Sequence, residues 1–321
     1  MDSAEARKDV NWYEHRADYS RVIGPDNHRP SARPGDLLSA RYELGKELAR
    51  GDTAVVYEAW DTHLNRRVAF KIIDARHAGI AADEVLREAT ILARLEHECI
   101  VPIYDGGRLS GDRLYYVMRL VHGEPLGTFF AREPSLFARL RVFQKVCDAV
   151  AFAHDSGVIH RGLNPHSILA GNFGEVFVID WGLAEWLAGS ASTGIALASG
   201  TSRYLAPEQT GERSDPVDGR ADVFALGAIL HDLLREGESR PLAAIARKAL
   251  APDPIDRYQH VEHLAADLMR FLDHLPVSAY DETLLERAGQ FANRHRVLLL
   301  VLAVYALVRL TIFLLSGGPI P

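Results

Sequence analysis

The stretch Val158–Ala184 has the sequence VIHRGLNPHSILAGNFGEVFVIDWGLA, and it decides the fold of this chain. Val158 and Ile159 predict a short buried strand, and a polar loop follows them. The apolar segment Glu175–Ile179 predicts a second strand, which ends at Asp180. The stretch therefore predicts two strands separated by a polar loop, with a carboxylate at the end of the second strand.

This stretch resembles the catalytic loop and the metal-binding loop of the bacterial Ser/Thr protein kinases of eukaryotic type. The residues that carry the resemblance are His160, Arg161, Leu163, Pro165, Ile168, Leu169, Asp180, Trp181 and Gly182. Three positions depart from the family pattern, with Gly162 in place of the catalytic Asp, Asn164 in place of a Lys, and Ser167 in place of the metal-ligating Asn. The resemblance therefore implies a kinase fold whose catalytic loop has lost residues that perform the chemistry.

Composition places the chain among folded proteins and gives no reason to expect nucleic acid as a partner. The chain has 321 residues, of which 48% are hydrophobic and 25% charged, enough for a two-lobed domain with appendages. Its net charge of -7 provides no attraction for nucleic acid. The two cysteines, Cys99 and Cys147, lie in apolar segments, so we interpret them as buried thiols in a reducing cytosol.

The resemblance implies an α+β fold with two lobes: a β-rich N-lobe that includes the family's helix C, and a mostly helical C-lobe with a shortened helix G region. We expect strands within residues 41–73, at 99–105 and at 114–118, and helix C at 83–95. The predicted segments are a flexible arm at 1–38, an N-lobe at 39–120, a C-lobe at 121–275, a juxtamembrane segment at 276–296, a transmembrane helix at 297–315 and a tail at 316–321.

The transmembrane helix is predicted because residues 297–315 contain only two residues, Arg309 and Thr311, that are neither apolar nor aromatic. A central Arg costs about 2.5 to 3.5 kcal/mol, while each Leu, Ile, Phe or Val returns roughly 0.3 to 0.6 kcal/mol, so the sum favours insertion. A buried C-terminal helix is the alternative, but the segment has no polar face. The basic flank Arg294–Arg296 predicts a single-pass protein of the inner membrane with its kinase-like domain in the cytoplasm.

The N-lobe contains the residues that the resemblance assigns to the phosphates of ATP. The segment Leu48–Tyr57 stands where the family has its glycine-rich phosphate loop, and it keeps one of the three glycines, Gly51. Lys71 follows at the family's distance and is the implied phosphate ligand. Glu88 on helix C is its implied ion-pair partner, although a lone Lys and Glu would ordinarily be surface charges.

The adenine of ATP is placed by the same resemblance. Val56, Ala69 and Leu169 would enclose the base, Met118 would close the back of the pocket, and Val121 would belong to the hinge beside the base. These residues are equally suitable as ordinary core aliphatics, and the two interpretations do not exclude each other. ATP is therefore the nucleotide that the resemblance implies.

The implied metal is Mg²⁺, held through Asp180. A hydroxyl at Ser167 is a weaker and shorter ligand than the amide it replaces, so a second metal ion is not expected. Gly162 has no side chain, and a positioned general base is worth about 10² to 10⁴ in rate. His166 is disfavoured as a replacement base, because its place after Pro165 directs it elsewhere.

Other residues of the resemblance have structural roles. In the family, the histidine at the position of His160 belongs to an apolar spine that here would include Trp181 and would be anchored on Asp222. Arg257 is expected to pair with Glu208. We therefore interpret these residues as parts of the fold and not of the reaction.

Three functional hypotheses follow. The first is a membrane-tethered pseudokinase that binds ATP and acts as a binding or scaffolding module for an unidentified protein, with an active kinase as one candidate partner. The alternative is a weakly active Ser/Thr protein kinase that transfers the ATP γ-phosphate to protein hydroxyls. The third is a scaffold that binds no nucleotide. The losses at Gly162, Asn164 and Ser167 favour the first hypothesis.

Overall fold

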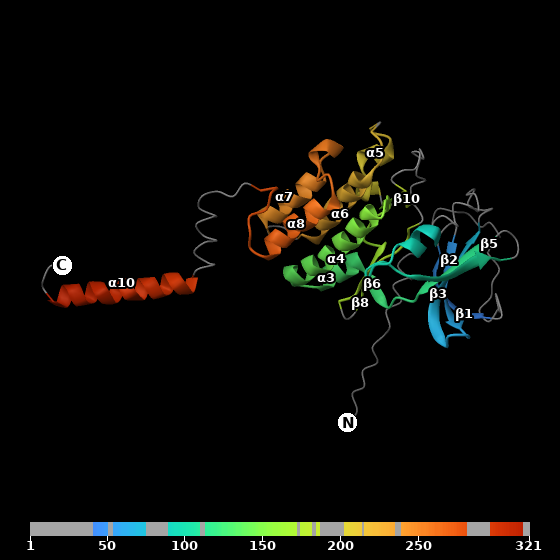
Figure 1. The fold of residues 1–321 in the computed structure, drawn as a ribbon, viewed down its shortest axis with the longest axis horizontal. Coiled ribbons are helices and arrows are strands. Elements are labelled where there is room, and N and C mark those ends of the chain that lie inside the picture. Colours follow the sequence, from blue (N-terminus) through green and yellow to red (C-terminus); the bar gives the residue numbers. More distant parts are fainter. Residues whose placement is uncertain are drawn as a thin grey trace, which may run out of the picture.

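The computed structural model describes residues 41–50, 54–74, 89–109, 113–171, 174–181, 184–186, 202–213, 215–234, 239–280 and 296–316. Figure 1 shows a β-sheet lobe beside a helical lobe, which is the two-lobed α+β architecture that the sequence implies. The arm at 1–38, Gly51, Glu88 and Gly182 lie outside the described residues. The predictions that rest on them stay predictions.

An antiparallel sheet forms the N-lobe. Its strands are β1 (Tyr42–Arg50), β2 (Ala54–Asp61), β3 (Arg66–Asp74), β4 (Ile103–Arg108) and β5 (Arg113–Arg119), and they lie in the order β1-β2-β3-β5-β4. The ring of Phe70 meets that of Tyr42 edge to face, with centroids 5.5 Å apart, and stacks on that of Tyr115 at 4.8 Å. The predicted strands within residues 41–73 are confirmed as β1, β2 and β3.

The strand predicted at residues 99–105 is displaced along the chain. It begins only at Ile103, because Pro102 has no N–H to donate to a neighbouring strand. The residues before Pro102 pair with the C-lobe instead, where the Val178 N–H donates to the Cys99 carbonyl at 2.7 Å. This segment therefore joins the two lobes beside the expected nucleotide site.

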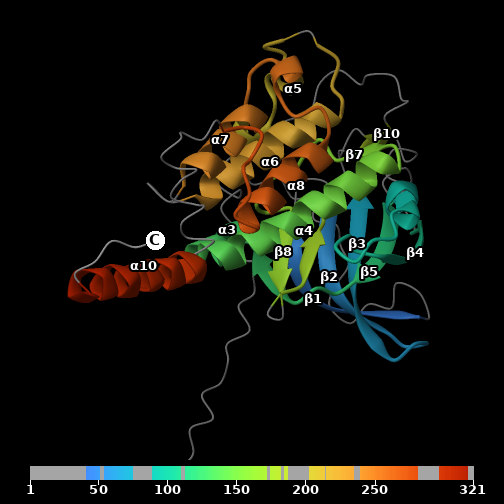
Figure 2. The ribbon, with the colours of Figure 1, turned by 60° about the vertical axis from the view of Figure 1, so that its left-hand side comes forward.

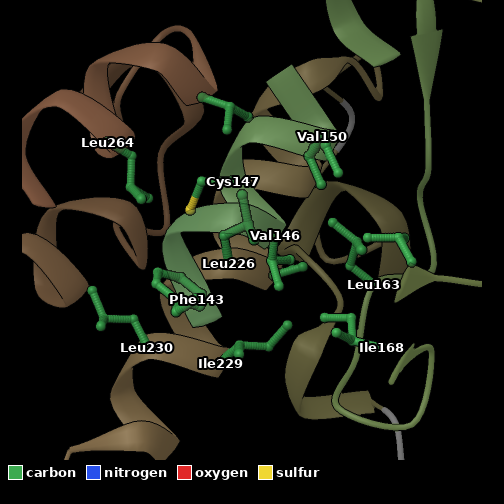
Figure 3. Packing of buried hydrophobic residues seen from close by; sticks show 14 of the residues in the cluster. Phe143, Val146, Cys147, Val150, Leu163, Ile168, Leu226, Ile229, Leu230 and Leu264 are labelled. Carbon is green, nitrogen blue, oxygen red and sulfur yellow. The ribbon is translucent and has the colours of Figure 1, made fainter. Parts of the chain in front are cut away.

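Helices build the C-lobe. They are α3 (Leu126–Arg132), α4 (Leu136–Asp155), α5 (Pro207–Thr210), α6 (Gly219–Leu233), α7 (Arg240–Ala249) and α8 (Val261–Leu272). Figure 2 shows α4 running across the lobe, and Figure 3 shows the apolar face of α4 from close by. Phe143, Val146, Cys147 and Val150 recur there at helical spacing and are fully buried. The predicted burial of Cys147 is confirmed, and desolvation raises the pKa of its thiol.

The stretch that decides the fold forms three short strands. They are β7 (Val158–Ile159), β8 (Ile168–Gly171) and β9 (Val176–Val178), and β8 pairs with both β9 and β6 (Gly123–Pro125). The sequence predicts β7 and β9 but places β8 within the loop. The Ile179 N–H donates to the Ser167 carbonyl at 2.8 Å, so the β8–β9 hairpin sets the polar loop beside Asp180.

Helices α6 and α7 pack directly on each other, with only residues 234–239 between them. A Cβ added at Gly227 of α6 would lie 2.6 Å from the Cβ of Ala249, so the close approach of the two helices requires glycine at this position. Over the described residues, neither α6 nor α7 exposes a large hydrophobic side chain. The short connection that the sequence predicts therefore leaves a packed surface here.

The C-terminal segment forms the helix α10 (Arg296–Ser316), which stands apart from both lobes in Figure 1. The structure describes its side chains from Leu300 to Ile312, and nine large hydrophobic side chains among them are 49% to 65% exposed. Over the described residues, no helix is both long and apolar enough to cross a membrane. The transmembrane helix predicted at residues 297–315 is therefore not confirmed.

Candidate nucleotide site and catalytic loop

Lys71 and Asp180 meet across the two lobes. Lys71 lies on β3, opposite Val56 of β2 and Tyr116 of β5. Its Nζ lies 3.7 Å from Oδ1 of Asp180 and 5.1 Å from the centroid of the Tyr116 ring. The Lys71 residue is only 9% exposed, whereas the Asp180 side chain is 41% exposed. The pair therefore joins a buried cation to a carboxylate that is exposed to solvent.

The implied ion pair of Lys71 with Glu88 is a separate prediction, and Glu88 lies outside the described residues.

Asp180 is held in a strained conformation. Its φ of 67° lies in the left-handed region, which few residues other than glycine adopt. The neighbouring residues fix it in place, because the Ile179 N–H donates to Ser167 and the buried Trp181 donates its indole N–H to the Val178 carbonyl at 3.3 Å. Strain of this kind persists only where the surrounding structure imposes it, and it gathers at functional sites.

The residues implied to enclose adenine lie in two apolar clusters. Ala69 and Val56 pack with Leu48 and Ala49 in the N-lobe, and Leu169 packs with Val121, Val101 and Phe177 below them. Met118 packs against both clusters. The structure thus brings together Val56, Ala69, Met118, Val121 and Leu169, the five apolar residues of the implied adenine site.

The phosphate loop carries a methyl group where the family has a glycine. Ala49 is buried, and its side chain belongs to the cluster of Leu48, Val56 and Ala69. The methyl group therefore strengthens the roof of the site, while it removes the open backbone that a glycine would offer to phosphate.

Asn164 and Ser167 are bound to each other within the catalytic loop. The Ser167 hydroxyl donates to the Asn164 carbonyl at 2.9 Å and accepts the Asn164 N–H at 3.0 Å. The Asn164 amide donates to the Gly162 carbonyl at 2.9 Å, and its oxygen accepts the N–H groups of His166 and Ser167 at 2.9 and 3.3 Å. Both side chains are therefore engaged in holding the shape of the loop.

These bonds bear on the metal that the family uses. The Ser167 hydroxyl is buried, donates its O–H to the Asn164 carbonyl and accepts the Asn164 N–H, so only one of its two lone pairs is left for a metal. Among the described residues, no group of three or more His, Cys, Asp or Glu side chains forms a metal site. The Asp180 carboxylate is partly exposed, and the other oxygens around a bound Mg²⁺ would come from the phosphates of ATP and from water.

Asp222 fixes the first half of the loop. Its carboxylate accepts the N–H groups of His160 and Arg161, each at 2.8 Å, and lies 2.8 Å from Nε2 of His154. Burial alone would raise the pKa of Asp222, but the hydrogen bonds from His154 and His160 outweigh it and hold this pKa below its usual value. The carboxylate therefore stays ionised and organises the loop backbone.

His160 has a structural environment. It is fully buried, its ring lies 4.6 Å from that of Trp181, and burial lowers its pKa, so the imidazole is neutral. Nδ1 accepts the Gly162 N–H at 3.3 Å, which leaves the proton on Nε2 to face the Ile179 carbonyl at 3.3 Å. The predicted contacts of His160 with Trp181 and Asp222 are confirmed.

Acid is expected to destabilise the fold through these two groups. The pKa of buried His160 lies below its ordinary value of 6.5. Below pH 6.5 the histidine is therefore protonated more readily in the unfolded chain than in the folded one. The free energy of unfolding falls as the pH drops below 6.5. The depressed pKa of Asp222 adds a loss below 3.8, as the pH passes through the folded value. Urea unfolding of wild type and His160→Gln across this range checks the first part. Equal pH slopes for the two proteins above pH 3.8 would contradict it.

The loop is also tied to the segment that follows it. Arg161 has a φ of 64°, and Gln209 of α5 donates its amide to the Arg161 carbonyl at 2.8 Å. The oxygen of the same Gln209 amide accepts the Ala206 N–H at 3.1 Å. The sequence reasoning missed Gln209, whose one signal is its place in the first turn of a helix that begins with proline.

Glu208 and Arg257 form a buried ion pair at the base of the C-lobe. Both guanidinium NH₂ groups of Arg257 donate to the Glu208 carboxylate, at 2.6 and 2.8 Å. The remaining donors of Arg257 reach the carbonyls of Arg220, Ala251 and Pro252. The predicted ion pair is confirmed, and each nitrogen of the Arg257 guanidinium has a hydrogen-bond acceptor.

Comparison with known proteins agrees with this geometry. Residues 42–274 match the family described as protein kinase domain. The chain is 34% identical to serine/threonine-protein kinase PknB of Mycobacterium tuberculosis, over 75% of this chain and 44% of that protein. It is 33% identical to a probable serine/threonine-protein kinase of Corynebacterium efficiens, over 72% of this chain and 41% of that one.

A probable serine/threonine-protein kinase of Streptomyces coelicolor is similar at 32% identity, over 75% of this chain and 41% of that protein. The chain thus spans less than half the length of the curated relatives it matches. The match to the kinase domain nevertheless covers both lobes and the whole catalytic loop. The chain belongs to the protein kinase family, and within it is similar to the bacterial serine/threonine kinases.

Proposed function

We propose that this protein is a membrane-tethered pseudokinase, a signalling protein that uses the kinase fold as a binding or scaffolding module and does not transfer phosphate. The observation that carries the proposal is the mutual bonding of Asn164 and Ser167. At two positions where the family has a phosphate-binding Lys and a metal-binding Asn, this chain has side chains that serve the loop. The third position, Gly162, has no side chain to act as a base.

The size of the deficit supports the proposal. A positioned general base contributes about 10² to 10⁴ in rate, and Gly162 removes it. Asn164 also leaves out a positive charge near the transferring phosphate, and Ser167 removes a metal ligand. These losses act on one transition state, so phosphate transfer above the background of a Lys71→Ala variant is not expected.

ATP binding is part of the proposal. Lys71 would hold phosphate oxygens, the apolar clusters around Met118 would hold the base, and Asp180 would hold Mg²⁺ that ATP itself helps to bind. Bound ATP would be a charged ligand in contact with both lobes. The residues of this chain orient it, and Lys71 and Asp180 come from opposite lobes, so binding would fix the lobes relative to each other.

Thermal unfolding with ATP tests this binding. At a concentration of one hundred times Kd, ATP should stabilise the wild type by about 2.7 kcal/mol, which is roughly a 5 to 10 °C rise in Tm for a domain of this size. Lys71→Ala should lose most of the rise, and Lys46→Ala, which changes an exposed lysine of β1, should keep it. Asp180→Ala should lose only the part that depends on Mg²⁺. An equal rise in wild type and Lys71→Ala would contradict the assignment.

The alternative, a weakly active Ser/Thr kinase, is favoured by one observation. Lys71 and Asp180 still face each other at 3.7 Å, which is the arrangement that a phosphate and its metal require. Measurable transfer to protein hydroxyls, lost in Lys71→Ala, would support the alternative. The third hypothesis, a scaffold without nucleotide, would be supported if ATP raised the Tm of none of these proteins.

The membrane tether rests on residues 297–315 and on the exposed apolar side chains from Leu300 to Ile312. Exposure of this apolar surface to water costs free energy, whereas the hydrocarbon core of a bilayer would bury it. The full-length protein should stay with membranes after alkaline extraction, and a chain ending at residue 280 should not. A full-length protein that remained folded and free of membranes would contradict the tether. The protein partner, with an active kinase as one candidate, stays a prediction.

A further inference from the structure

A cavity of about 320 Å³ lies in the C-lobe between α7 and α8. Its walls come from the last turn of α7, the loop before α8, one face of α8, and the segment that follows α8. The lining includes Lys248, Arg257, Tyr258, His263, Arg270 and Ser278. None of them belongs to the implied nucleotide site or to the catalytic loop.

Three cationic side chains and one histidine line this cavity. Lys248 comes from α7, while His263 and Arg270 stand seven residues apart on α8 and so share one face of that helix. Arg257 also lines the cavity, but Glu208 neutralises it through two hydrogen bonds. The lining contains no carboxylate. Lys248, Arg270 and His263 are therefore the groups available to an incoming ligand.

Lys248 has an aromatic partner in place of a carboxylate. Its Nζ lies 4.4 Å from the centroid of the Tyr258 ring, a cation–π contact that positions the ammonium and leaves its N–H donors unused. Across the described part of the chain, Lys248 has no carboxylate within ion-pair distance. A cation oriented in this way can bind an anion without first giving up an ion pair.

A second carboxylate, Asp267, bonds to residues of the cavity wall and is fully buried. It accepts hydrogen bonds from the Tyr258 hydroxyl at 2.9 Å, Arg270 at 3.0 Å, the Ser278 hydroxyl at 2.6 Å and the Ser278 N–H at 2.8 Å. The Ala279 N–H adds a further bond at 3.2 Å. Asp267 is thus saturated with donors, and it fixes Tyr258, Arg270 and Ser278 as a rigid wall.

The charges around the cavity leave a positive excess. Arg257 and Glu208 cancel, Asp267 cancels one of Lys248 and Arg270, and one unit of positive charge remains before His263 is counted. The Arg270 guanidinium is half-exposed and uses one of its N–H groups on Asp267, so others are free to face the cavity. Converging Lys and Arg donors of this kind suit the oxygens of a phosphate.

We propose that this cavity binds a phosphate group, carried either by a small soluble phosphate ester or by a lipid head group. The proposal is independent of the nucleotide site. The lipid source is included because Ser278 forms part of the wall and lies in the segment that leads toward α10. In both cases the bound group is a phosphate whose oxygens accept hydrogen bonds from Lys248 and Arg270.

Binding of soluble phosphates is measured by calorimetry on the full-length protein in a zwitterionic detergent, with inorganic phosphate and glycerol 3-phosphate as probes. Lys248→Gln removes one charged donor without breaking an ion pair and should weaken binding about tenfold or more. Arg247→Gln is the matched control, because Arg247 is the adjacent exposed cation of α7 and does not line the cavity. It should leave binding unchanged.

The lipid source is tested in phosphatidylcholine vesicles with and without phosphatidylglycerol, by following acylation of Lys248 with an amine-reactive reagent. Phosphatidylglycerol should slow the acylation of Lys248 and not that of exposed Lys46, and Arg270→Gln should abolish the protection. Soluble binding that depends on Lys248 identifies a free phosphate ester, and protection seen only with phosphatidylglycerol identifies a head group. The proposal is wrong if neither effect occurs, or if Arg247→Gln weakens binding as much as Lys248→Gln.

Discussion

Arg257→Met is expected to lower the free energy of unfolding by about 3 to 5 kcal/mol. The substitution leaves the Glu208 carboxylate buried without its bidentate partner, and an uncompensated charge in the interior is far more costly than a missing surface pair. It also leaves the carbonyls of Arg220, Ala251 and Pro252 without their donor. Urea unfolding of the full-length protein, followed by tryptophan fluorescence, measures the loss.

Two controls distinguish the effect of breaking the buried ion pair from the effect of removing an arginine. Glu208→Leu combined with Arg257→Met should be less destabilised than Arg257→Met alone, because no unpaired charge remains. Arg67→Met breaks the exposed pair of Arg67 with Glu58 and should cost about 0 to 1 kcal/mol. If Arg257→Met costs no more than Arg67→Met, the buried pair does not support the C-lobe as described.

Restoring the three lost side chains should create phosphate transfer that we do not expect of the wild type. Gly162→Asp supplies the base, Asn164→Lys the positive charge and Ser167→Asn the metal ligand. In a site that also has its charge and its metal ligand, a positioned base is worth about 10² to 10⁴ in rate, so the triple variant should exceed the wild type by at least that range. Incorporation of labelled γ-phosphate into a generic protein substrate measures the gain.

The single substitutions serve as controls for this gain. Gly162→Asp alone should gain little, because Asn164 and Ser167 stay bonded to each other and neither a charge nor a metal ligand is added. The triple variant also loses hydrogen bonds of the loop, at about 1 kcal/mol each, so its Tm has to be measured first. A folded triple variant that responds to ATP but transfers no phosphate would show that the deficit lies outside these positions.

Much of the fold followed from sequence because its signals are strong. The spacing of Phe143, Val146, Cys147 and Val150 predicts one buried face of a helix, and α4 presents that face to the core. The pair of Glu208 and Arg257, separated by 49 residues, was implied only by family resemblance, since no periodicity connects residues so far apart. The local pattern of apolar residues predicted this helix, and the family resemblance predicted the long-range ion pair.

The loop's own bonding was not predictable in the same way. Asn-Pro at positions 164 and 165 indicates a turn, but which donors and acceptors meet depends on the backbone angles of the whole loop. The cavity of Lys248, His263 and Arg270 had no sequence signal, because it forms only when α7 packs beside α8. The strand β8 was also missed, because it forms by pairing with β6 and β9, and no local pattern shows that pairing.

We propose above all that the kinase fold persists here without phosphate transfer. The most direct measurement compares label incorporation from γ-labelled ATP by full-length wild type, Lys71→Ala and the triple variant, each at the same concentration with Mg²⁺. We expect wild type and Lys71→Ala to give the same background and the triple variant to exceed both. Incorporation by the wild type that clearly exceeds Lys71→Ala would contradict the claim and identify a working kinase.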